Sequence, residues 1–533
     1  MSTPTLHASV TLDRLTFAWP DGSTALDSVS GAFGSGRTGL VGRNGAGKST
    51  LLRLIAGDLD PTAGTVTTTG EVAYLPQQLT LDVERRVAEL LGVAGALDAV
   101  RAIAAGDVDP AHFEAVGDDW DIEARAAASL AEAGLSPEFL DRRVGELSGG
   151  EAVLVAIAGI RLRRAPITLL DEPTNNLDRD ARAKLAAMVA AWKGTLIVVS
   201  HDISLLDGMD DTAELFGRTL SVFGGPYSEW RAWLDAEQDA ARQAERDAAQ
   251  VMRKEKRQRI EAETKLAHRA RTAHKAEVEK RVPKIIAHGR KMAAEVSAGK
   301  LRTEVGAKED AARAALDQAG RRVRSEASMK IELPDPQVSR SRRIATIGDA
   351  ERSWVVQGPE RVALIGRNGA GKTTLLERLV AGTAPRGEGA DAEAHVEHIG
   401  YLPQRVDGLD ETRTVFDNIA AAAPHVPEKE LRNRLARFLI RGATADRPVA
   451  ALSGGERFRV ALATLLLADP APQLVVLDEP TNNLDLDTVD QLVDALTAYR
   501  GAVLVVSHDD AFLARLDLDL TLEIDGEGML QEV

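Results

Sequence analysis

The chain carries one series of strand and helix patterns twice, once on each side of a polar middle segment. In the first half, alternating apolar and polar residues in SVTLDRLTFAW and ALDSVSGAF predict two short strands. An apolar strand, a glycine-rich loop and an amphipathic helix follow in RTGLVGRNGAGKSTLLRLIAG, and the second half repeats this order. Between the halves, residues 231–280 contain neither Pro nor Gly, which predicts one long helix.

Each glycine-rich loop fits the phosphate-loop pattern and stands between an apolar strand and a helix, as that pattern requires. Glycine lets the backbone wrap so that its N–H groups face phosphates, and the helix N-terminus adds a favourable dipole. Lys48 is expected to reach the β- and γ-phosphates, and the Ser49 hydroxyl to bind Mg²⁺. The nucleotide-binding residues predicted from the two loops are Gly42, Asn44, Gly45, Gly47, Lys48, Ser49 and Thr50, with Gly366, Asn368, Gly369, Gly371, Lys372, Thr373 and Thr374.

Four further motifs are repeated in the same order in both halves. YLPQ occurs at 74–77 and 401–404, and LSGGE at 147–151 and 452–456. DEPTNNLD follows an apolar strand at 171–178 and 478–485, and VVSHD occurs at 198–202 and 505–509. Because chance does not produce an ordered duplication of this length, the chain contains two copies of one domain.

These motifs resemble those of ATP-binding-cassette ATPases, and the combination of LSGGE with DEPTNNLD is highly specific. The resemblance covers nearly the whole chain outside the middle segment. It implies an α/β fold of two cassettes, each with a RecA-like core, an antiparallel β subdomain and a helical subdomain. It also implies that the cassettes pair head to tail, with ATP between one copy's phosphate loop and the other's LSGGE. Two such composite sites are expected.

The resemblance also assigns chemistry to residues of each copy. Phosphoryl transfer to water needs a metal, phosphate donors and a polarised water. Glu172 and Glu479 would be the general bases for that water, and His201 and His508 would contact the γ-phosphate. The residues implied around Mg²⁺ are Ser49, Gln77, Asp171, Thr373, Gln404 and Asp478. The signature residues implied to close over the opposite nucleotide are Ser148, Gly149, Gly150 and Glu151, with Ser453, Gly454, Gly455 and Glu456.

Each of these assignments has a simpler competitor. A carboxylate pair after an apolar strand is often a strand-to-loop cap, and an isolated His or Gln is usually solvated or structural. Trp19 occupies roughly the place of the aromatic residue that stacks on adenine in this family, but core packing is a competing interpretation. The repetition of the motifs in register favours the functional interpretation for the carboxylates and histidines.

The two copies differ in ways that fall on one composite site. The second half supplies no aromatic residue at the relative position of Trp19. The first signature continues with Ala152 and Val153, whereas the second continues with the basic residues usual after this motif. The second phosphate loop would face the first signature, so we expect that site to turn over more slowly. The first copy also has about 20 extra residues between Gln77 and Leu147, which predict a modest helical insertion.

The middle segment concentrates positive charge in an acidic chain. The protein has a formal net charge of −16, yet residues 231–330 hold 25 Lys and Arg against 16 Asp and Glu. Pro283 and Gly289 interrupt the helical pattern, so we expect two helices of roughly 45 residues, each about 65 Å long, with a bend near 281–300. The charge favours a polyanionic partner, with a solvated charged face as the competing interpretation. The candidates for phosphate contacts near the bend are Lys280, Arg281, Lys284, Arg290 and Lys291.

Tandem cassettes, the absence of a membrane segment and a basic helical linker of this length resemble the ABC-F family of ribosome-associated translation factors. The resemblance implies ATP and Mg²⁺ as cofactors and the ribosome as partner, with the linker approaching the P-site tRNA and the peptidyl-transferase centre. The predicted domains are 1–229 for the first cassette, 230–330 for the linker and 331–533 for the second cassette. We expect a monomer whose cassettes pair within the chain, without a stable membrane subunit.

The composition and the linker limit the alternative locations and functions of this protein. The chain has no cysteine, which excludes disulfides and thiolate metal sites, and no apolar run approaches the roughly 20 residues of a membrane helix, so we expect a cytoplasmic protein. An ATPase subunit of a drug exporter would have no use for the basic hairpin. A DNA-repair ATPase would normally carry zinc-binding cysteines or very long coiled coils. Antibiotic resistance and a housekeeping role in translation both remain open, as does the resting arrangement of the cassettes.

Overall fold

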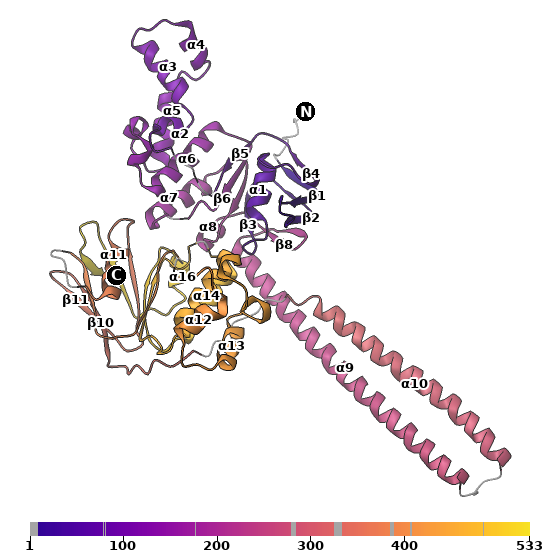
Figure 1. The fold of residues 1–533 in the computed structure, drawn as a ribbon. Helices are drawn as coiled ribbons and strands as arrows, with labels where there is room; N and C mark the ends of the chain where they lie inside the picture. The colour runs from indigo at the N-terminus through magenta and orange to yellow at the C-terminus, as the bar shows by residue number, and fades with distance from the viewer. Residues whose placement is uncertain are drawn as a thin grey trace, which may run out of the picture. The chain divides into compact units, whose positions relative to one another are not determined.

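The computed structural model describes residues 9–77, 79, 82–175, 177–278, 284–324, 333–383, 389–405, 408–482 and 484–533. Figure 1 shows the helices and strands of the chain. The chain divides into two compact units. One unit, Met1–Ser228 with Ser328–Val533, contains both cassettes, and the other, Glu229–Ala327, contains the middle segment.

One sheet organises the first cassette. Its strands in the described residues are β1 (Val10–Ala18), β2 (Thr24–Phe33), β3 (Gly36–Val41), β4 (Ala63–Thr68), β5 (Val72–Leu75), β6 (Ile167–Asp171), β7 (Thr195–Val199), β8 (Asp211–Phe216) and β9 (Thr219–Phe223). They lie in the order β4-β1-β2-β9-β8-β3-β7-β6-β5. The centre is parallel, since β3 pairs with β7 and β8, and β6 pairs with β5 and β7. β1 pairs antiparallel with β2 and β4, which gives the predicted antiparallel subdomain.

The helices of the first cassette are α1 (Lys48–Ala56), α2 (Val87–Leu90), α3 (Ala94–Ala104), α4 (Pro110–Val116), α5 (Ile122–Glu132), α6 (Gly149–Arg163), α7 (Arg179–Ala190) and α8 (Ile203–Leu206). Short 3₁₀ turns occupy Pro137–Asp141 and Val144–Glu146. The insertion predicted after Gln77 is helical, as expected, and includes α3 and α4. Asp109 begins α4 by accepting the backbone N–H of Ala111 at 2.9 Å, which is a normal helix cap.

The central strands β6 and β7 are buried along their whole length, because apolar side chains cover both faces of a parallel sheet. Alternate side chains of β6 therefore pack into two different hydrophobic cores, one on each face of the sheet. Ile167 and Leu169 pack with α1 on one face, and Leu170 packs with α6 on the other. Asp171 is the last residue of this strand, so the apolar run delivers a carboxylate to the carboxyl edge of the sheet.

The second cassette repeats this plan with two sheets. Its strands are β10 (Arg343–Gly348), β11 (Ser353–Gln357), β12 (Arg361–Gly366), β13 (Asp391–Ala394), β14 (Ile399–Leu402), β15 (Leu474–Asp478), β16 (Ala502–Val506), β17 (Leu520–Ile524) and β18 (Leu530–Glu532). The orders are β11-β10-β13 and β14-β15-β16-β12-β17-β18. The helices are α11 (Lys372–Ala381), α12 (Val415–Ala422), α13 (Glu428–Arg437), α14 (Gly454–Leu466), α15 (Leu486–Ala498) and α16 (Asp510–Leu513), with 3₁₀ turns at Gly442–Thr444 and Val449–Ala451. The predicted α/β fold class is confirmed.

Two long helices, α9 (Tyr227–Val278) and α10 (Lys284–Gly320), make up the middle segment. Their 52 and 37 residues correspond to about 78 and 56 Å at 1.5 Å per residue. Arg259 of α9 forms an ion pair with Glu309 of α10, and the backbone N–H of Arg324 donates to Gln238 Oε1 at 2.8 Å. The ion pair joins the two helices, and the hydrogen bond joins α9 to the residues that follow α10, as in the predicted antiparallel hairpin.

The prediction that Gly289 interrupts the helix is wrong, because α10 begins at Lys284 and continues through that position. One Gly inside a helix costs only about 1 kcal/mol relative to Ala, which the helix-forming residues around it offset. Among the predicted phosphate contacts, Lys280 and Arg281 lie outside the described residues. Lys284, Arg290 and Lys291 belong to α10, but their side chains lie outside the described part of the structure.

Candidate nucleotide sites

The phosphate loop of each cassette turns from a buried strand into a helix at glycines that tolerate no side chain. Gly42 has a φ of 150°, and a Cβ there would lie 2.6 Å from the carbonyl oxygen of Leu215. Gly366 has a φ of 144°, and its Cβ would lie 2.3 Å from the carbonyl oxygen of Ile524. The close approach of β8 and β17 therefore explains why the loop must begin with Gly.

A buried lysine holds each loop in its curled form. Lys48 Nζ donates to the carbonyl oxygen of Gly42 at 2.5 Å, and Lys372 Nζ donates to that of Gly366 at 2.6 Å. Burial lowers the pKa of both amines. The remaining predicted residues lie in the loop or in the first turn of the helix that follows it: Asn44, Gly45, Gly47, Ser49, Thr50, Asn368, Gly369, Gly371, Thr373 and Thr374. This geometry places a cation and a helix N-terminus where phosphates would bind.

A hydroxyl and a carboxylate meet beside each loop. Ser49 Oγ donates to Asp171 Oδ1 at 3.1 Å, and Thr373 Oγ1 donates to Asp478 Oδ2 at 2.7 Å. Burial raises the pKa of both Asp residues above the ordinary value. Hydroxyl and carboxylate oxygens are the donors that Mg²⁺ prefers, and Mg²⁺ is commonly held by one or two carboxylates together with phosphates. The residues present therefore fit Mg²⁺. The described residues include no cluster of three or more His, Cys, Asp or Glu side chains that would hold a metal without such phosphates.

The glutamate after each Asp has a backbone that non-glycine residues rarely adopt. Glu172 has a φ of 50° and Glu479 a φ of 46°. Their backbone N–H groups donate to Val199 and Val506, each at 2.8 Å, which hold this conformation in place. A left-handed non-glycine residue costs about 1–3 kcal/mol and is typical of functional sites.

Each of these glutamates contacts the histidine of the VVSHD motif. Glu172 Oε1 lies 3.1 Å from His201 Nε2, and Glu479 Oε1 lies 3.4 Å from His508 Nε2. Burial raises the pKa of both Glu residues to about 7. Burial, reinforced by the nearby lysines, lowers the pKa of His201 to about 3 and that of His508 to about 4. The histidines are therefore neutral near pH 7, and the glutamates have the proton affinity expected of a general base at that pH.

The first site also contains buried polar atoms that lack a partner. Glu172 Oε2 and His201 Nδ1 have no hydrogen-bond partner in the described structure. Such an atom costs about 1–3 kcal/mol when it stays unsatisfied. A water molecule or a nucleotide at this position would remove that cost, so the orphaned atoms are consistent with a binding site.

Each phosphate loop contacts the end of the DEPTNNLD motif of the other cassette. The backbone N–H of Asn44 donates to Asp485 Oδ2 at 2.8 Å, and that of Asn368 donates to Asp178 Oδ2 at 3.4 Å. Arg43 Nε also donates to Asp487 Oδ2 at 2.9 Å. These reciprocal contacts are those of a head-to-tail pair. Sequence reasoning missed these Asp residues as cross-cassette ligands, although both were visible as the last residue of a repeated motif.

Tyr74 is a second residue that sequence reasoning missed. Its hydroxyl donates to Asp171 Oδ2 at 3.3 Å, and burial raises its pKa. It is the first residue of YLPQ, so the repeat itself was the signal. The glutamines at the end of that motif, Gln77 and Gln404, are exposed and form no hydrogen bond with Asp171 or Asp478 in the described structure.

Both LSGGE signatures begin a helix through the same capping arrangement. Ser148 accepts the backbone N–H of Glu151 at 3.3 Å, and the Glu151 carboxylate accepts that of Ser148 at 2.8 Å. Ser453 and Glu456 repeat this at 3.4 and 2.9 Å. Gly149 and Gly454 are exposed, while Gly150 and Gly455 are buried. No hydrogen bond joins a signature to a phosphate loop among the described residues.

The adenine platform differs between the cassettes. Trp19 is half-buried and lies edge-on against Phe17, with ring centroids 4.9 Å apart, so it makes the core contact that the competing interpretation required. In the second cassette, Asp349 follows β10 at the corresponding turn and accepts the backbone N–H of Arg352 at 2.8 Å.

The residues that follow the two signatures also differ. After the first signature, Ala152 is buried. After the second, Arg457 forms an ion pair with Glu411 at 2.9 Å.

Comparison with known sequences agrees with this geometry. The ABC transporter family matches residues 26–175 and 351–482, which include the phosphate loops and both signatures. No helix in the described part of the chain is long and apolar enough to cross a membrane.

Several curated relatives match the chain along most of its length. The tylosin resistance ATP-binding protein TlrC of Streptomyces fradiae is 32% identical over 93% of this chain and 94% of its own. The probable ATP-binding protein YheS of Escherichia coli K12 is 31% identical over 94% of this chain and 76% of its own. ATP-binding cassette sub-family F member 3 of Mus musculus is 30% identical over 90% of this chain and 66% of its own.

Solved structures share the fold at low identity. The archaeal ribosome recycling factor aABCE1, solved in complex with the ribosomal stalk protein aP1, has a TM-score of 0.56 and 20% identity, covering 97% of this chain and 89% of that chain. The RNase-L Inhibitor has a TM-score of 0.56 and 19% identity, covering 98% and 90%. The family match and the curated relatives lead to one conclusion: the chain is an ATPase that belongs to the ABC-F family of tandem ATP-binding-cassette proteins.

Proposed function

We propose that the protein binds ATP and Mg²⁺ between its cassettes, hydrolyses the ATP, and acts on the ribosome in translation or in protection against antibiotics. The reciprocal contacts of Asn44 with Asp485 and of Asn368 with Asp178 carry the first part, because they bring each phosphate loop to the opposite cassette. The ABC-F family and the named relatives support the second part.

In the first site, the chain's own residues would act as follows. Lys48 and the N-terminus of α1 bind the phosphates, and Ser49 with Asp171 would hold Mg²⁺, which supplies neutralising charge when bound. Glu172 accepts the proton of the attacking water at Oε2, its unpartnered oxygen. His201 keeps Glu172 in position and presents a neutral ring towards the γ-phosphate.

The second site would use equivalent residues with two differences. Lys372, Thr373, Asp478, Glu479 and His508 repeat the contacts described above. The turn after β10 offers Asp349 in place of an aromatic platform. The facing signature carries Ala152 and Val153, so we propose that this site turns over more slowly than the first.

The basic hairpin supports the ribosome as partner. An excess of positive charge lies in α9 and α10, while the whole protein is acidic, and ribosomal RNA is the polyanion that an ABC-F protein meets. We propose that the distal end of the hairpin reaches the P-site tRNA and the peptidyl-transferase region. Contacts there would be mainly to the RNA backbone, since residues 251–300 contain no Phe, Trp or Tyr among their basic side chains.

Co-sedimentation with ribosomes tests this function. The Glu172→Gln, Glu479→Gln double variant should pellet with ribosomes when ATP is present and remain in the supernatant without it. Neutralising Lys280, Arg281, Lys284 and Arg290 in that background should abolish most of the pelleting.

A matched control removes the same charge from the opposite end of α10 and the turn that follows it. Its four neutralised residues are all exposed: Lys308, Arg313, Arg321 and Arg322. This variant should pellet like the parent. If the parent double variant does not pellet with ribosomes under either condition, the ribosomal function is wrong, and an exporter-associated ATPase becomes the better account.

A further inference from the structure

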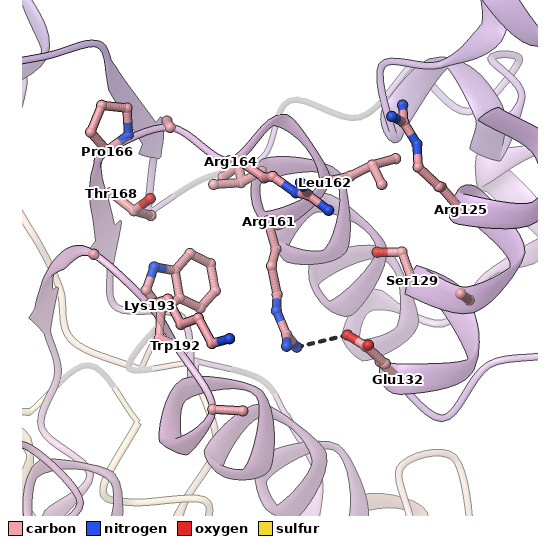
Figure 2. Close-up of a pocket in the computed structure, with 15 residues that line it drawn as sticks. Arg125, Ser129, Glu132, Arg161, Leu162, Arg164, Pro166, Thr168, Trp192 and Lys193 are labelled. Carbon is pink, nitrogen blue, oxygen red and sulfur yellow. Dashed lines mark ion pairs between the residues drawn. The ribbon is translucent and has the colours of Figure 1, made fainter. Parts of the chain in front are cut away.

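A cavity of about 720 Å³ lies in the first cassette, where α5 and the end of α6 approach the amino ends of β6 and β7 (Figure 2). Thr168 lines it from near the start of β6, whereas Asp171 lies at the other end of the same strand. The cavity and the ATP site are therefore separate. Its volume lies within the range of about 300–1,000 Å³ that is typical of small-molecule sites.

The lining of this basic cavity is cationic. Arg125, Arg161, Arg164 and Lys193 contribute positive charge, and Glu132 is the acidic side chain among the lining residues. Arg161 is paired with Glu132 at 3.0 Å, as Figure 2 shows. Arg164 and Lys193 are exposed and have no ion pair with any described residue. Two uncommitted cations beside one cavity favour an anionic ligand, particularly in a protein of net charge −16.

Two neutral groups add hydrogen-bonding and stacking capacity. Thr168 is only 1% exposed and lines the cavity. A hydroxyl can donate one hydrogen bond and accept others, so Thr168 offers a polar contact to a ligand. Trp192 is half-buried in the same lining, and its indole offers a flat surface on which a base can stack.

The second cassette provides an internal comparison, because the motifs align the two copies. Counting from LSGGE and from DEPTNNLD gives these replacements: Leu466 for Arg161, Asp469 for Arg164, Val475 for Thr168 and Tyr499 for Trp192. Tyr499 is buried and donates its hydroxyl to the carbonyl oxygen of Pro472. Lys193 corresponds to Arg500, which keeps the positive charge and pairs with Asp335 at 3.3 Å. The charges of Arg161 and Arg164 and the hydroxyl of Thr168 are lost in the copy. The shared cassette fold does not require them, which points to a separate role in the first cassette.

We propose that the basic cavity binds a nucleotide, with its phosphate between Arg164 and Lys193, a polar group on the Thr168 hydroxyl and its base against Trp192. A free nucleotide and one nucleotide of an RNA strand share this chemistry. The RNA source rests on the proposed ribosomal function, whereas the free-nucleotide source does not.

Binding to the full chain tests the proposal. The Glu172→Gln, Glu479→Gln variant is saturated with ATP and Mg²⁺ so that the catalytic sites are occupied. Uridine monophosphate and a short single-stranded oligouridine are then titrated separately by calorimetry. Arg164→Asp, which installs the residue of the second cassette, and Lys193→Glu should each weaken binding about tenfold or more, since each removes a charge-assisted contact. Both positions are exposed, so these variants should fold.

Arg163→Asp is the matched control, because Arg163 is exposed on the same helical turn but does not line the cavity. It should leave the affinity unchanged. Binding of the monophosphate that the cavity variants weaken identifies a free-nucleotide site, and binding of the oligouridine alone identifies an RNA contact. Binding of neither probe, or equal loss with Arg163→Asp, overturns the proposal. Ribosome co-sedimentation by the same protein is scored separately, so failure here leaves the proposed function standing.

Discussion

The backbone N–H of Asn44 in the first phosphate loop donates to the carboxylate of Asp485 in the second cassette, at 2.8 Å. The other oxygen of the same carboxylate accepts the backbone N–H of Thr488 at 2.9 Å and so begins α15. One side chain therefore fixes a helix in its own cassette and the phosphate loop of the other. Closure of the first site is thereby linked to the local structure of the second cassette.

Asp485→Asn should lower ATP turnover while leaving stability nearly unchanged. Asn caps helices about as well as Asp, so α15 keeps its start, but the charge that receives the Asn44 N–H is lost. We expect roughly a tenfold reduction in the ATPase rate, corresponding to a charged hydrogen bond. Asp487→Asn is the control, because its ion pair with Arg43 is partly exposed and contributes little. Unchanged turnover in Asp485→Asn would show that the contact is incidental.

Glu172→Gln should reduce ATP turnover more than Glu479→Gln does. Removing a general base typically costs 10²-fold or more at its own site, and the site that is faster in the parent contributes more to the total rate. We expect the site of Glu479 to be the slower one, because it lacks an aromatic platform and faces the altered signature. Steady-state phosphate release from each single variant measures the ranking, and a larger loss from Glu479→Gln would reverse it.

Asp210→Asn should destabilise the first cassette in a pH-dependent way. Arg37 Nη2 donates to Asp210 Oδ1 at 2.6 Å, and this bond holds the pKa of Asp210 below its ordinary value. The contribution is therefore present above the unfolded-state pKa of about 3.9 and is lost as the pH falls through the lower folded value. Since the pair is partly exposed, we expect a loss of about 1 kcal/mol at pH 7.

Denaturant unfolding at several pH values measures this effect. The difference between the parent and Asp210→Asn should shrink as the pH falls below about 4. Asp60→Asn, at an exposed position without an ion pair in the described structure, should show no such trend. A difference that is constant with pH would mean that the charge of Asp210 is not responsible.

Glu309→Gln should loosen the hairpin. Glu309 is 7% exposed and pairs with Arg259 across the two helices. Its replacement leaves the Arg259 guanidinium with Glu263 of its own helix as carboxylate partner, so the ion pair between the helices is lost. Backbone amides of α10 should then exchange with deuterium faster, and Arg259→Gln should add little further effect in the double variant. Glu304→Gln, exposed on the same helix, should exchange like the parent. Identical exchange in Glu309→Gln would assign the hairpin's stability to other contacts.

The sequence predicted those features that depend on local pattern. Short apolar runs such as ITLLD favour a buried strand, and the glycine-rich loops favour a tight turn into a helix. The strands that end at Asp171 and Asp478 were therefore predictable. The duplication then made the assignment of two cassettes unambiguous. The hairpin followed from the long stretch without Pro or Gly.

Features that depend on contacts across the fold were not predictable. The Asn44–Asp485 bond joins residues that are 441 positions apart, and no local pattern encodes it. The left-handed backbone of Glu172 arises because β7 holds its N–H, not from a preference of Glu. The sequence predicts a helix break at Gly289 because the local helix propensity of Gly is poor, yet its small cost is outweighed by the surrounding helix.

The helices α9 and α10 are also a covalent tether between the two cassettes. Because both cassettes belong to one polypeptide, their association is unimolecular, and each meets the other at an effective concentration set by the connecting chain. The ATP dependence of closure should therefore be the same in a dilute and in a concentrated solution of the protein. A cell could then keep very few copies of this protein without losing the paired state that hydrolysis requires.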